Sequence, residues 1–283
     1  MIKQDKTQEY KLIAFDMDGT LLSSDKTILK SSKQAIQKAA DAGKIVVLST
    51  GRGPAELADY IPDVPSLRYM ICVSGALIYD LQKQCAVYRT AIAPDVVKQL
   101  IDFAELETAR AQLLTDRSIV QRDFFEHMDK YHMSAYVPLY DRCADKWENM
   151  PEQFAQDPFP VEKVNLYHLD TDSRMRTKQR IEAADLPVEL AFSEYSSLEC
   201  SAFGIDKGTG LKRLCEALHI PLQQTIAVGD AENDLGILRT AGLAVAMGNA
   251  AQSVQDIADV TVADCDHDGC AQAIERYLLG SCE

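Results

Sequence analysis

Two acidic residues at the end of a short apolar run form the first group that could carry chemistry. Asp16 and Asp18 lie in the segment Asp-Met-Asp-Gly-Thr, directly after the apolar residues 11–15. In an extended chain, residues two apart project to the same side, so both carboxylates can reach one ligand. One can attack an electrophile while the other transfers a proton. A lone pair of this kind also occurs in solvated turns and simple cation sites, so its meaning depends on its neighbours.

A second acidic group follows another apolar run. Residues 229–234 read Gly-Asp-Ala-Glu-Asn-Asp. Together with Asp16, Asp230 could supply the hard oxygen ligands that Mg²⁺ prefers beside water and substrate phosphate. Asn233 and Asp234 could also cap the start of a helix. Capping does not explain why an acidic pair follows a buried strand in the same way as Asp16 does.

Two further polar groups could balance this negative charge. Thr50 and Gly51 follow the apolar residues 45–48, and Lys207 opens a predicted helix. A hydroxyl can donate to a phosphate oxygen, and an ammonium can neutralise a phosphate or the carboxylates. The helix dipole disfavours a cation at a helix start, so the position of Lys207 favours a functional role over a solvated surface.

Apolar runs and helical patterns alternate around these groups. Strands are predicted at 11–15, 45–48, 69–73, 225–228 and 243–247, and helices at 31–42, 54–60, 207–218 and 234–241. This alternation is typical of a parallel sheet covered by helices. The carboxyl ends of parallel strands meet at one edge, where ligands bind, so the four polar groups are expected to lie together.

The middle of the chain alternates less regularly. It has a predicted helix at 95–107 and predicted strands at 164–169 and 188–192. We therefore expect an α/β fold, in which a doubly wound, Rossmann-like parallel sheet is formed by residues 1–89 and 203–283. A smaller α/β domain, residues 90–202, is expected to be inserted between these two pieces.

The four groups, in this order and spacing, resemble the haloacid dehalogenase-like superfamily, and most closely its Cof-type branch of sugar-phosphate phosphatases. The resemblance covers nearly the whole chain. It also includes Gly75-Ala76, residues 246–250 and Asp268-Gly269. It implies a Mg²⁺-dependent phosphatase that forms a phosphoaspartate intermediate on a small phosphorylated metabolite. The inserted domain would then be a cap that sets substrate specificity.

The resemblance also implies roles for single residues. Asp16 matches the nucleophile and Asp18 the general acid that later becomes the base. Asp230 matches the Mg²⁺ ligand that acts with Asp16 and the backbone carbonyl of Asp18. The positions that match phosphate or substrate contacts are Thr50, Gly51, Lys207 and Asn233, and Asp234 matches a position that supports phosphate and metal.

Two departures and one spacing refine the resemblance. Ser74 stands where the family usually has Asn before Gly75, which could weaken a phosphate or substrate contact. Gly236 stands where the family often carries a larger residue. Thr50 follows Asp16 by only 34 positions, whereas Lys207 follows Thr50 by 157. Only the longer interval has room for a cap, as in Cof-type relatives.

An excess of acidic residues limits the partners of the chain. A formal net charge of −14 repels nucleic acid and anionic membranes, so we expect neither as a main partner. The first ten residues lack the apolar core of a signal peptide, and no run of about 18 apolar residues could span a membrane. The eight cysteines include no C-x-x-C pair and are expected to be reduced thiols. These features predict a soluble cytoplasmic protein, with the oligomeric state left open.

Two other functions remain open at this stage. A phosphomutase on the same scaffold would return the phosphoryl group to a sugar instead of water. A regulatory protein would bind a sugar phosphate without turnover, although the presence of Asp16, Asp18, Lys207 and Asp230 argues against this. The sequence does not name the substrate, because the motifs lie outside the predicted cap.

Overall fold

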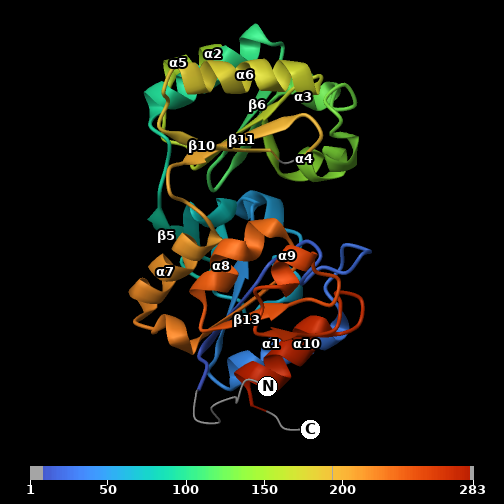
Figure 1. Cartoon of the computed structure of the whole chain (residues 1–283). Coiled ribbons are helices and arrows are strands. Elements are labelled where there is room, and N and C mark those ends of the chain that lie inside the picture. Colours follow the sequence, from blue (N-terminus) through green and yellow to red (C-terminus); the bar gives the residue numbers. More distant parts are fainter. Residues whose placement is uncertain (1–8, 193, 281–283) are drawn as a thin grey trace. The chain divides into compact units, whose positions relative to one another are not determined.

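A computed structural model describes residues 9–192 and 194–280 (Figure 1). The predictions about the first eight residues and about Cys282 therefore lie outside the described part. The chain divides into two compact units. Unit 1 comprises the residues up to Gly51, Asp59–Tyr88, and the residues from Asp206 onward, and unit 2 comprises Arg52–Ala58 and Arg89–Ile205.

Unit 1 is built on one sheet, whose eight described strands have the order β14-β13-β12-β1-β2-β3-β4-β5. In this order they are Val260–Thr261, Leu243–Ala246, Thr225–Gly229, Leu12–Phe15, Ile45–Ser49, Tyr69–Cys72, Leu77–Asp80 and Cys85–Arg89. The first six run parallel, and β4 is antiparallel to β3. From β1 the chain winds outward through β2 on one side, and β12 lies on the other. The predicted doubly wound sheet is confirmed.

Helices cover this sheet on both faces, which is why its inner strands are apolar and buried along nearly their whole length. All four residues of β1 are buried. The helices are α1 (Lys30–Asp41), α7 (Lys207–Leu218), α8 (Leu235–Thr240), α9 (Gln252–Gln255) and α10 (Gly269–Ala273), which continues into a π-helical turn (Ile274–Leu278). Right-handed crossovers that leave β1 and β12 in opposite directions place α1 and α8 on opposite faces. Helix α1 packs beside α10 (Figure 1).

One segment differs from the prediction. The helix expected at 54–60 is only a short 3-10 turn, Pro54–Leu57, and the surrounding residues 52–58 group with unit 2, not with the expected core piece 1–89. The carboxylate of Glu56 accepts hydrogen bonds from the Gly53 backbone N–H and from Gln112 Nε2, both at 2.9 Å. Glu56 is only 6% exposed, so these two bonds, one local and one to a distant part of the chain, override the helical pattern.

Unit 2 contains a second sheet with the order β10-β11-β9-β6-β7-β8. In this order the strands are Val188–Phe192, Ser197–Ala202, Lys163–Tyr167, Arg110–Leu114, Ser118–Gln121 and Ala144–Trp147. Neighbouring strands are antiparallel, apart from the parallel pair β7 and β8. The helices are α2 (Pro94–Leu106), α3 (Arg122–Glu126), α4 (Val137–Cys143), α5 (Met150–Gln156) and α6 (Thr171–Ala183).

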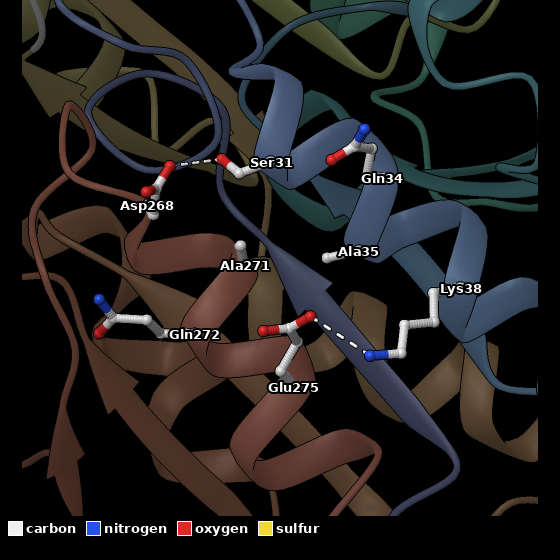
Figure 2. Close-up of a pocket in the computed structure, with 8 residues that line it drawn as sticks. All are labelled: Ser31, Gln34, Ala35, Lys38, Asp268, Ala271, Gln272 and Glu275. Carbon is white, nitrogen blue, oxygen red and sulfur yellow. Dashed lines mark hydrogen bonds and ion pairs between the residues drawn. The ribbon is translucent and has the colours of Figure 1, made fainter. Parts of the chain in front are cut away.

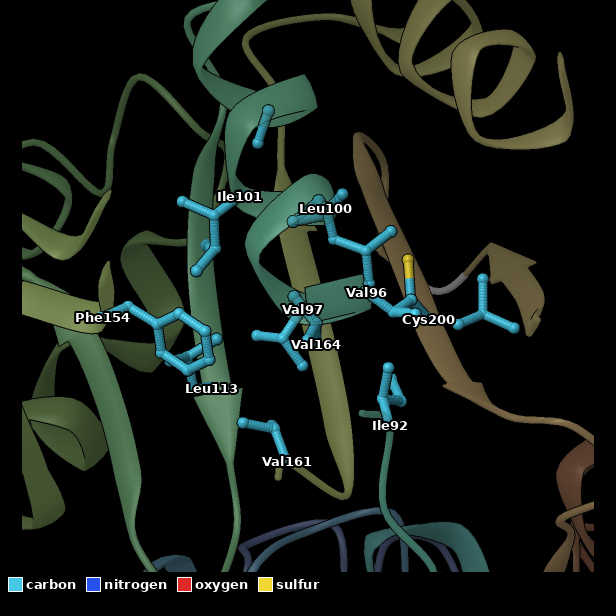
Figure 3. Packing of buried hydrophobic residues seen from close by; sticks show 14 of the residues in the cluster. Ile92, Val96, Val97, Leu100, Ile101, Leu113, Phe154, Val161, Val164 and Cys200 are labelled. Carbon is cyan, nitrogen blue, oxygen red and sulfur yellow. The ribbon is translucent and has the colours of Figure 1, made fainter. Parts of the chain in front are cut away.

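The two faces of the second sheet differ because side chains alternate along each strand. On one face, Val164 and Leu113 join a buried apolar cluster with Val97, Leu100 and Phe154 from α2 and α5 (Figure 3). On the other face, Gln112 of β6 is hydrogen-bonded to Asn165 and Tyr167 of β9. Unit 2 therefore has a conventional apolar core on one face, and a buried polar network beside a second, aromatic-rich cluster on the other.

Two sequence-based predictions concern the chain as a whole. Within the described residues, no helix is both long enough and apolar enough to cross a membrane. No disulfide joins the seven cysteines that the structure describes.

Candidate active site

The site begins where two neighbouring strands end. Asp16 follows β1 and Asp230 follows β12, and the register of these parallel strands pairs Phe15 with Val228. The Asp16 backbone N–H donates to the Val228 carbonyl at 3.1 Å. The two aspartates thus leave the sheet side by side, at the point where the winding of the chain reverses. In open α/β sheets, ligands bind at this point.

A buried lysine joins two carboxylates at this edge. Lys207 Nζ donates to Asp16 Oδ1 at 2.5 Å and to Asp234 Oδ1 at 2.7 Å. Exposure is 1% for Lys207, 6% for Asp16 and 0% for Asp234. The second oxygen of Asp234 accepts from the backbone N–H groups of Asp230 and Ala231, at 3.0 and 3.2 Å. One ammonium therefore faces two buried carboxylates, with Asp230 as a third acidic neighbour.

The pKa values reflect this shortage of positive charge. Burial raises the pKa of Asp16 to about 7, although Lys207 opposes the change. Burial also raises the pKa of Asp230, and the hydrogen bond from Thr20 opposes it. For Lys207, burial alone would lower the pKa, but Asp16 and Asp234 outweigh it and the pKa is raised. An additional cation would relieve this imbalance.

The donor set fits a magnesium ion. Carboxylate oxygens of Asp16, Asp230 and Asp234 lie within 4.8 Å of one another, and hard oxygen ligands of this kind suit Mg²⁺. Gly19 adopts a left-handed φ of +79°, and a Cβ there would lie 2.3 Å from Asp230 Oδ2. A glycine is thus required beside the predicted ligand. The three grouped side chains are not the same as the predicted ligand set. They include Asp234, whereas the predicted third ligand was Asp18, through its backbone carbonyl.

Two polar side chains hold the loop after β1 in place. Thr20 Oγ1 donates to Asp230 Oδ1 at 2.8 Å, and Asn249 Nδ2 donates to the Gly19 carbonyl at 2.8 Å. Neither Thr20 nor Asn249 was predicted to have a role of its own, although both lie in the motifs that carry the resemblance. Their contribution is to orient Asp230 and the loop that bears Asp18.

Close backbone packing positions Lys207 at the start of α7. The Asp206 side chain caps this helix by accepting from the Thr209 backbone N–H at 2.7 Å. A Cβ on Gly75 would lie 2.1 Å from the Asp206 carbonyl oxygen, and one on Gly236 would lie 2.1 Å from Asp206 Oδ2. Gly236, which departs from the family pattern, therefore leaves room for the Asp206 side chain that caps the start of α7.

The remaining predicted ligand-binding residues lie around this centre in different environments. Thr50 follows β2 and is 2% exposed, Gly51 is half-buried, and Asn233 is exposed in the turn before α8. The Thr50 carbonyl accepts from the Ser74 backbone N–H at 3.0 Å. Ser74 has a left-handed φ of 56°, a conformation that Asn and Gly adopt more readily than Ser. Contacts of Thr50, Gly51 and Asn233 with phosphate stay predictions.

Asp18 differs sharply from Asp16. Its side chain is 41% exposed, and its Oδ1 accepts from Lys26 Nζ at 2.9 Å. Asp16 is therefore fixed by burial and by Lys207, whereas Asp18 lies toward solvent in contact with a lysine of the same loop region. No role was predicted for Lys26 from the sequence.

A hollow of about 440 Å³ between α1 and α10 is a separate feature of unit 1 (Figure 2). Lys38 Nζ lies 3.4 Å from Glu275 Oε1, and Ser31 Oγ donates to Asp268 Oδ1 at 2.5 Å. These contacts join the two helices across the hollow. In the matched motif Asp268-Gly269, the aspartate thus contacts α1, and a Cβ at Gly269 would lie 2.1 Å from the Ala263 carbonyl oxygen. The motif has a packing role here.

Comparison with known proteins agrees with this geometry. The model of the haloacid dehalogenase-like hydrolases matches residues 13–274, so the chain belongs to this family and the resemblance is confirmed. One relative is the 5-amino-6-(5-phospho-D-ribitylamino)uracil phosphatase YitU of Bacillus subtilis, 29% identical over 281 residues that cover 96% of this chain and 99% of the relative. Another is the pyridoxal phosphate phosphatase YbhA of Escherichia coli, 27% identical with 95% and 99% coverage.

Solved structures show the same fold. A crystal structure of a haloacid dehalogenase-like hydrolase from Bacteroides thetaiotaomicron superposes with a TM-score of 0.82 at 25% sequence identity. The superposition covers 95% of this chain and 99% of the other. The similarity therefore extends over both units.

Proposed function

We propose that this protein is a Mg²⁺-dependent phosphomonoester hydrolase that forms a phosphoaspartate intermediate on Asp16. The observation that carries the proposal is the buried Asp16 carboxylate, 2.5 Å from Lys207 and beside Asp230 at the reversal point of the sheet. Membership of a hydrolase family and relatives that are named phosphatases support it. A carboxylate at this edge is placed to act as a nucleophile.

The chemistry follows from the roles of four side chains. Asp16 attacks phosphorus, and the bond from phosphorus to the leaving oxygen breaks as the new bond to the Asp16 oxygen forms. Asp18 gives its proton to the departing alcohol and then takes one from the water that hydrolyses the acyl phosphate. Lys207 and Thr50 stabilise the negative charge on the phosphoryl oxygens.

The cation would be held by the carboxylates of Asp16 and Asp230 and by the Asp18 backbone carbonyl, with Asp234 as a supporting neighbour. When bound, Mg²⁺ supplies positive charge that keeps Asp16 ionised and shields it from the substrate phosphate. Burial raises the pKa values of Asp16 and Asp230, so a bound cation would favour the ionised form of both carboxylates.

The substrate belongs to the small phosphorylated metabolites, with sugar phosphates as the first class to test. The relatives named above are phosphatases of phosphorylated small molecules. The inserted residues 90–202, which fall in unit 2, are proposed to set the choice of substrate. The cytoplasm is the proposed location.

The decisive experiment is a turnover screen across phosphorylated sugars, nucleotides and cofactors, which measures inorganic phosphate released with and without Mg²⁺. We expect release with Mg²⁺, loss of activity after exhaustive chelation, and inhibition by Ca²⁺, whose larger coordination number lets it engage both oxygens of Asp16. Full activity after chelation would contradict the proposal. Isomerisation of a hexose monophosphate without phosphate release would instead identify a phosphomutase.

A further inference from the structure

A tightly bonded turn follows the loop that carries Asp18. The Ser23 backbone N–H donates to the Thr27 carbonyl, and the Lys26 N–H donates to the Ser23 carbonyl, each at 2.9 Å. Ser24 donates from its backbone N–H and its Oγ to Asp266 Oδ1, at 2.9 and 3.1 Å. Ser23 is only 5% exposed. The turn is therefore held by its own hydrogen bonds and by the bonds to Asp266, which is far away in the sequence but belongs to the same unit.

Lys26 occupies an unusual position in this turn. Its φ is 58°, in the left-handed region that L side chains rarely adopt and that favours Gly or Asn. Its ammonium lies 2.9 Å from Asp18 Oδ1, with side-chain exposures of 60% for Lys26 and 41% for Asp18. Ion pairs this exposed contribute little to stability. Neither the backbone geometry nor the stability of the fold therefore accounts for a lysine here.

We propose that Lys26 is a positioning residue for Asp18, an inference that rests on the proposed acid–base role of Asp18. The contact from Lys26 Nζ to Asp18 Oδ1 restricts the rotamers of the Asp18 side chain, which lowers the entropic cost of reaching the reactive geometry. Burial and Lys207 hold Asp16, and Lys26 contributes to holding Asp18.

The first test compares Lys26→Met, which removes the charge, with Lys26→Arg, which keeps it. With Lys26→Met we expect kcat/KM on a sugar phosphate to fall about tenfold, a part of the usual contribution of a general acid. The loss should be smaller with p-nitrophenyl phosphate, whose leaving group needs no proton. Lys26→Arg should recover most of the activity. An equal loss on both substrates would overturn the inference.

A double-mutant cycle tests whether Lys26 acts through Asp18. In an Asp18→Asn background, Lys26→Met should cause no further loss of kcat/KM, because the group that it positions is already disabled. A full additional tenfold loss in that background would show that Lys26 acts on the substrate directly and would overturn the inference.

Matched glycine variants separate activity from stability. Gln84 is exposed and has φ 52° in another turn of unit 1, so Gln84→Gly and Lys26→Gly relieve the same backbone strain. Both should keep or raise Tm, and only Lys26→Gly should lose activity. Wild-type activity in Lys26→Gly would overturn the inference.

Asp16→Asn, assayed in parallel, distinguishes a failure of the proposed function from a failure of the inference about Lys26. If Asp16→Asn is inactive and Lys26→Met keeps wild-type kcat/KM on both substrates, only the role of Lys26 is wrong. If Asp16→Asn stays active, the proposed function fails and the role of Lys26 fails with it.

Discussion

Two buried polar regions, one in each unit, are organised in opposite ways. In unit 1, Lys207 faces the carboxylates of Asp16 and Asp234, so charged groups meet in a buried site. In unit 2, the amide of Gln112 is 0% exposed, and its Oε1 accepts from Tyr167 OH at 2.7 Å and from Tyr140 OH at 3.0 Å. The first region has surplus charge, and the second is mostly neutral.

The Gln112 amide also donates from Nε2 to Glu56 Oε1 at 2.9 Å and to Ser118 Oγ at 2.8 Å. Its donors and its acceptor are thus paired, as is expected of a polar group that stabilises a fold. Asp16 is also hydrogen-bonded, yet burial raises its pKa to about 7, which means that its charged form is poorly compensated. Unbalanced charge in a buried site is typical of a functional centre, where binding a cation or substrate supplies the missing charge.

The largest effect is expected from Asp16→Asn. Removal of the nucleophile should lower kcat by about 10³-fold or more. The fold should persist, because Asn has nearly the same size and its oxygen can still accept from Lys207. Phosphate release and circular dichroism measure the two properties. Asp63→Asn, at an exposed ion pair with Lys33 in the same unit, is the matched control. Retention of more than a few percent of wild-type kcat would remove Asp16 from its proposed role.

Much of this centre could be predicted from the sequence. The strands that carry Asp16 and Asp230 are buried on both faces, so they are read directly as apolar runs that end at a charged residue. The doubly wound sheet follows from the alternation of these runs with helices. The roles of Asp18 and Lys207, which spacing alone left open, came from the resemblance to the family and stay predictions.

Unit 2 was harder to predict, for physical reasons. Strand β8 reads Ala-Asp-Lys-Trp and lies at the edge of its sheet, so it carries no apolar run. The contact between Glu56 and Gln112 joins residues 56 positions apart, and no local sequence pattern predicts it. The pairing of Lys26 with Asp18 was missed for a related reason, since it depends on a left-handed backbone that the residue type disfavours.

The next largest effect is a difference in stability between the two buried regions. Lys207→Met leaves two buried carboxylates without their cation and should reduce the free energy of unfolding by about 3–5 kcal/mol. Gln112→Leu leaves two tyrosine hydroxyls and the Glu56 carboxylate with one partner fewer, while Glu56 keeps its bond from the Gly53 backbone N–H, so it should cost only about 1–3 kcal/mol. Urea denaturation measures both values. Saturating Mg²⁺ should restore part of the loss in Lys207→Met and none in Gln112→Leu. Equal costs for the two variants would show that the charge imbalance has no energetic consequence.

Asp18→Asn should have a smaller effect that depends on the leaving group. A sugar alkoxide needs a proton as it departs, whereas p-nitrophenolate does not, so the loss should be greater with the sugar phosphate. Single-turnover formation of the phosphoaspartate is the step to measure, because activation of water does not depend on the leaving group. Equal losses on both substrates in this step would show that Asp18 is not the general acid. A loss confined to hydrolysis would leave it as the base only.

The last expected effect is the contribution of Asp16 to the pH dependence of stability. The pKa of Asp16 is raised from 3.8 to about 7, so between these values the native state binds more protons than the unfolded state. The free energy of unfolding contributed by Asp16 should therefore fall as pH rises from 3.8 to about 7 in the metal-free protein. Other carboxylates also titrate here, so the quantity to measure is the difference between wild type and Asp16→Asn.

As pH rises across that window, the free energy of unfolding of the wild type should fall relative to that of Asp16→Asn. In saturating Mg²⁺ the difference should not depend on pH, because a bound cation keeps Asp16 ionised. Gln112→Leu removes no titrating group and should follow the wild-type curve in parallel. Urea denaturation at several pH values, with and without Mg²⁺, gives all three curves. If wild type and Asp16→Asn stay parallel without metal, Asp16 is already ionised throughout this range. Lys207 alone would then balance its charge, and the contrast between the two buried regions would be one of residue type only.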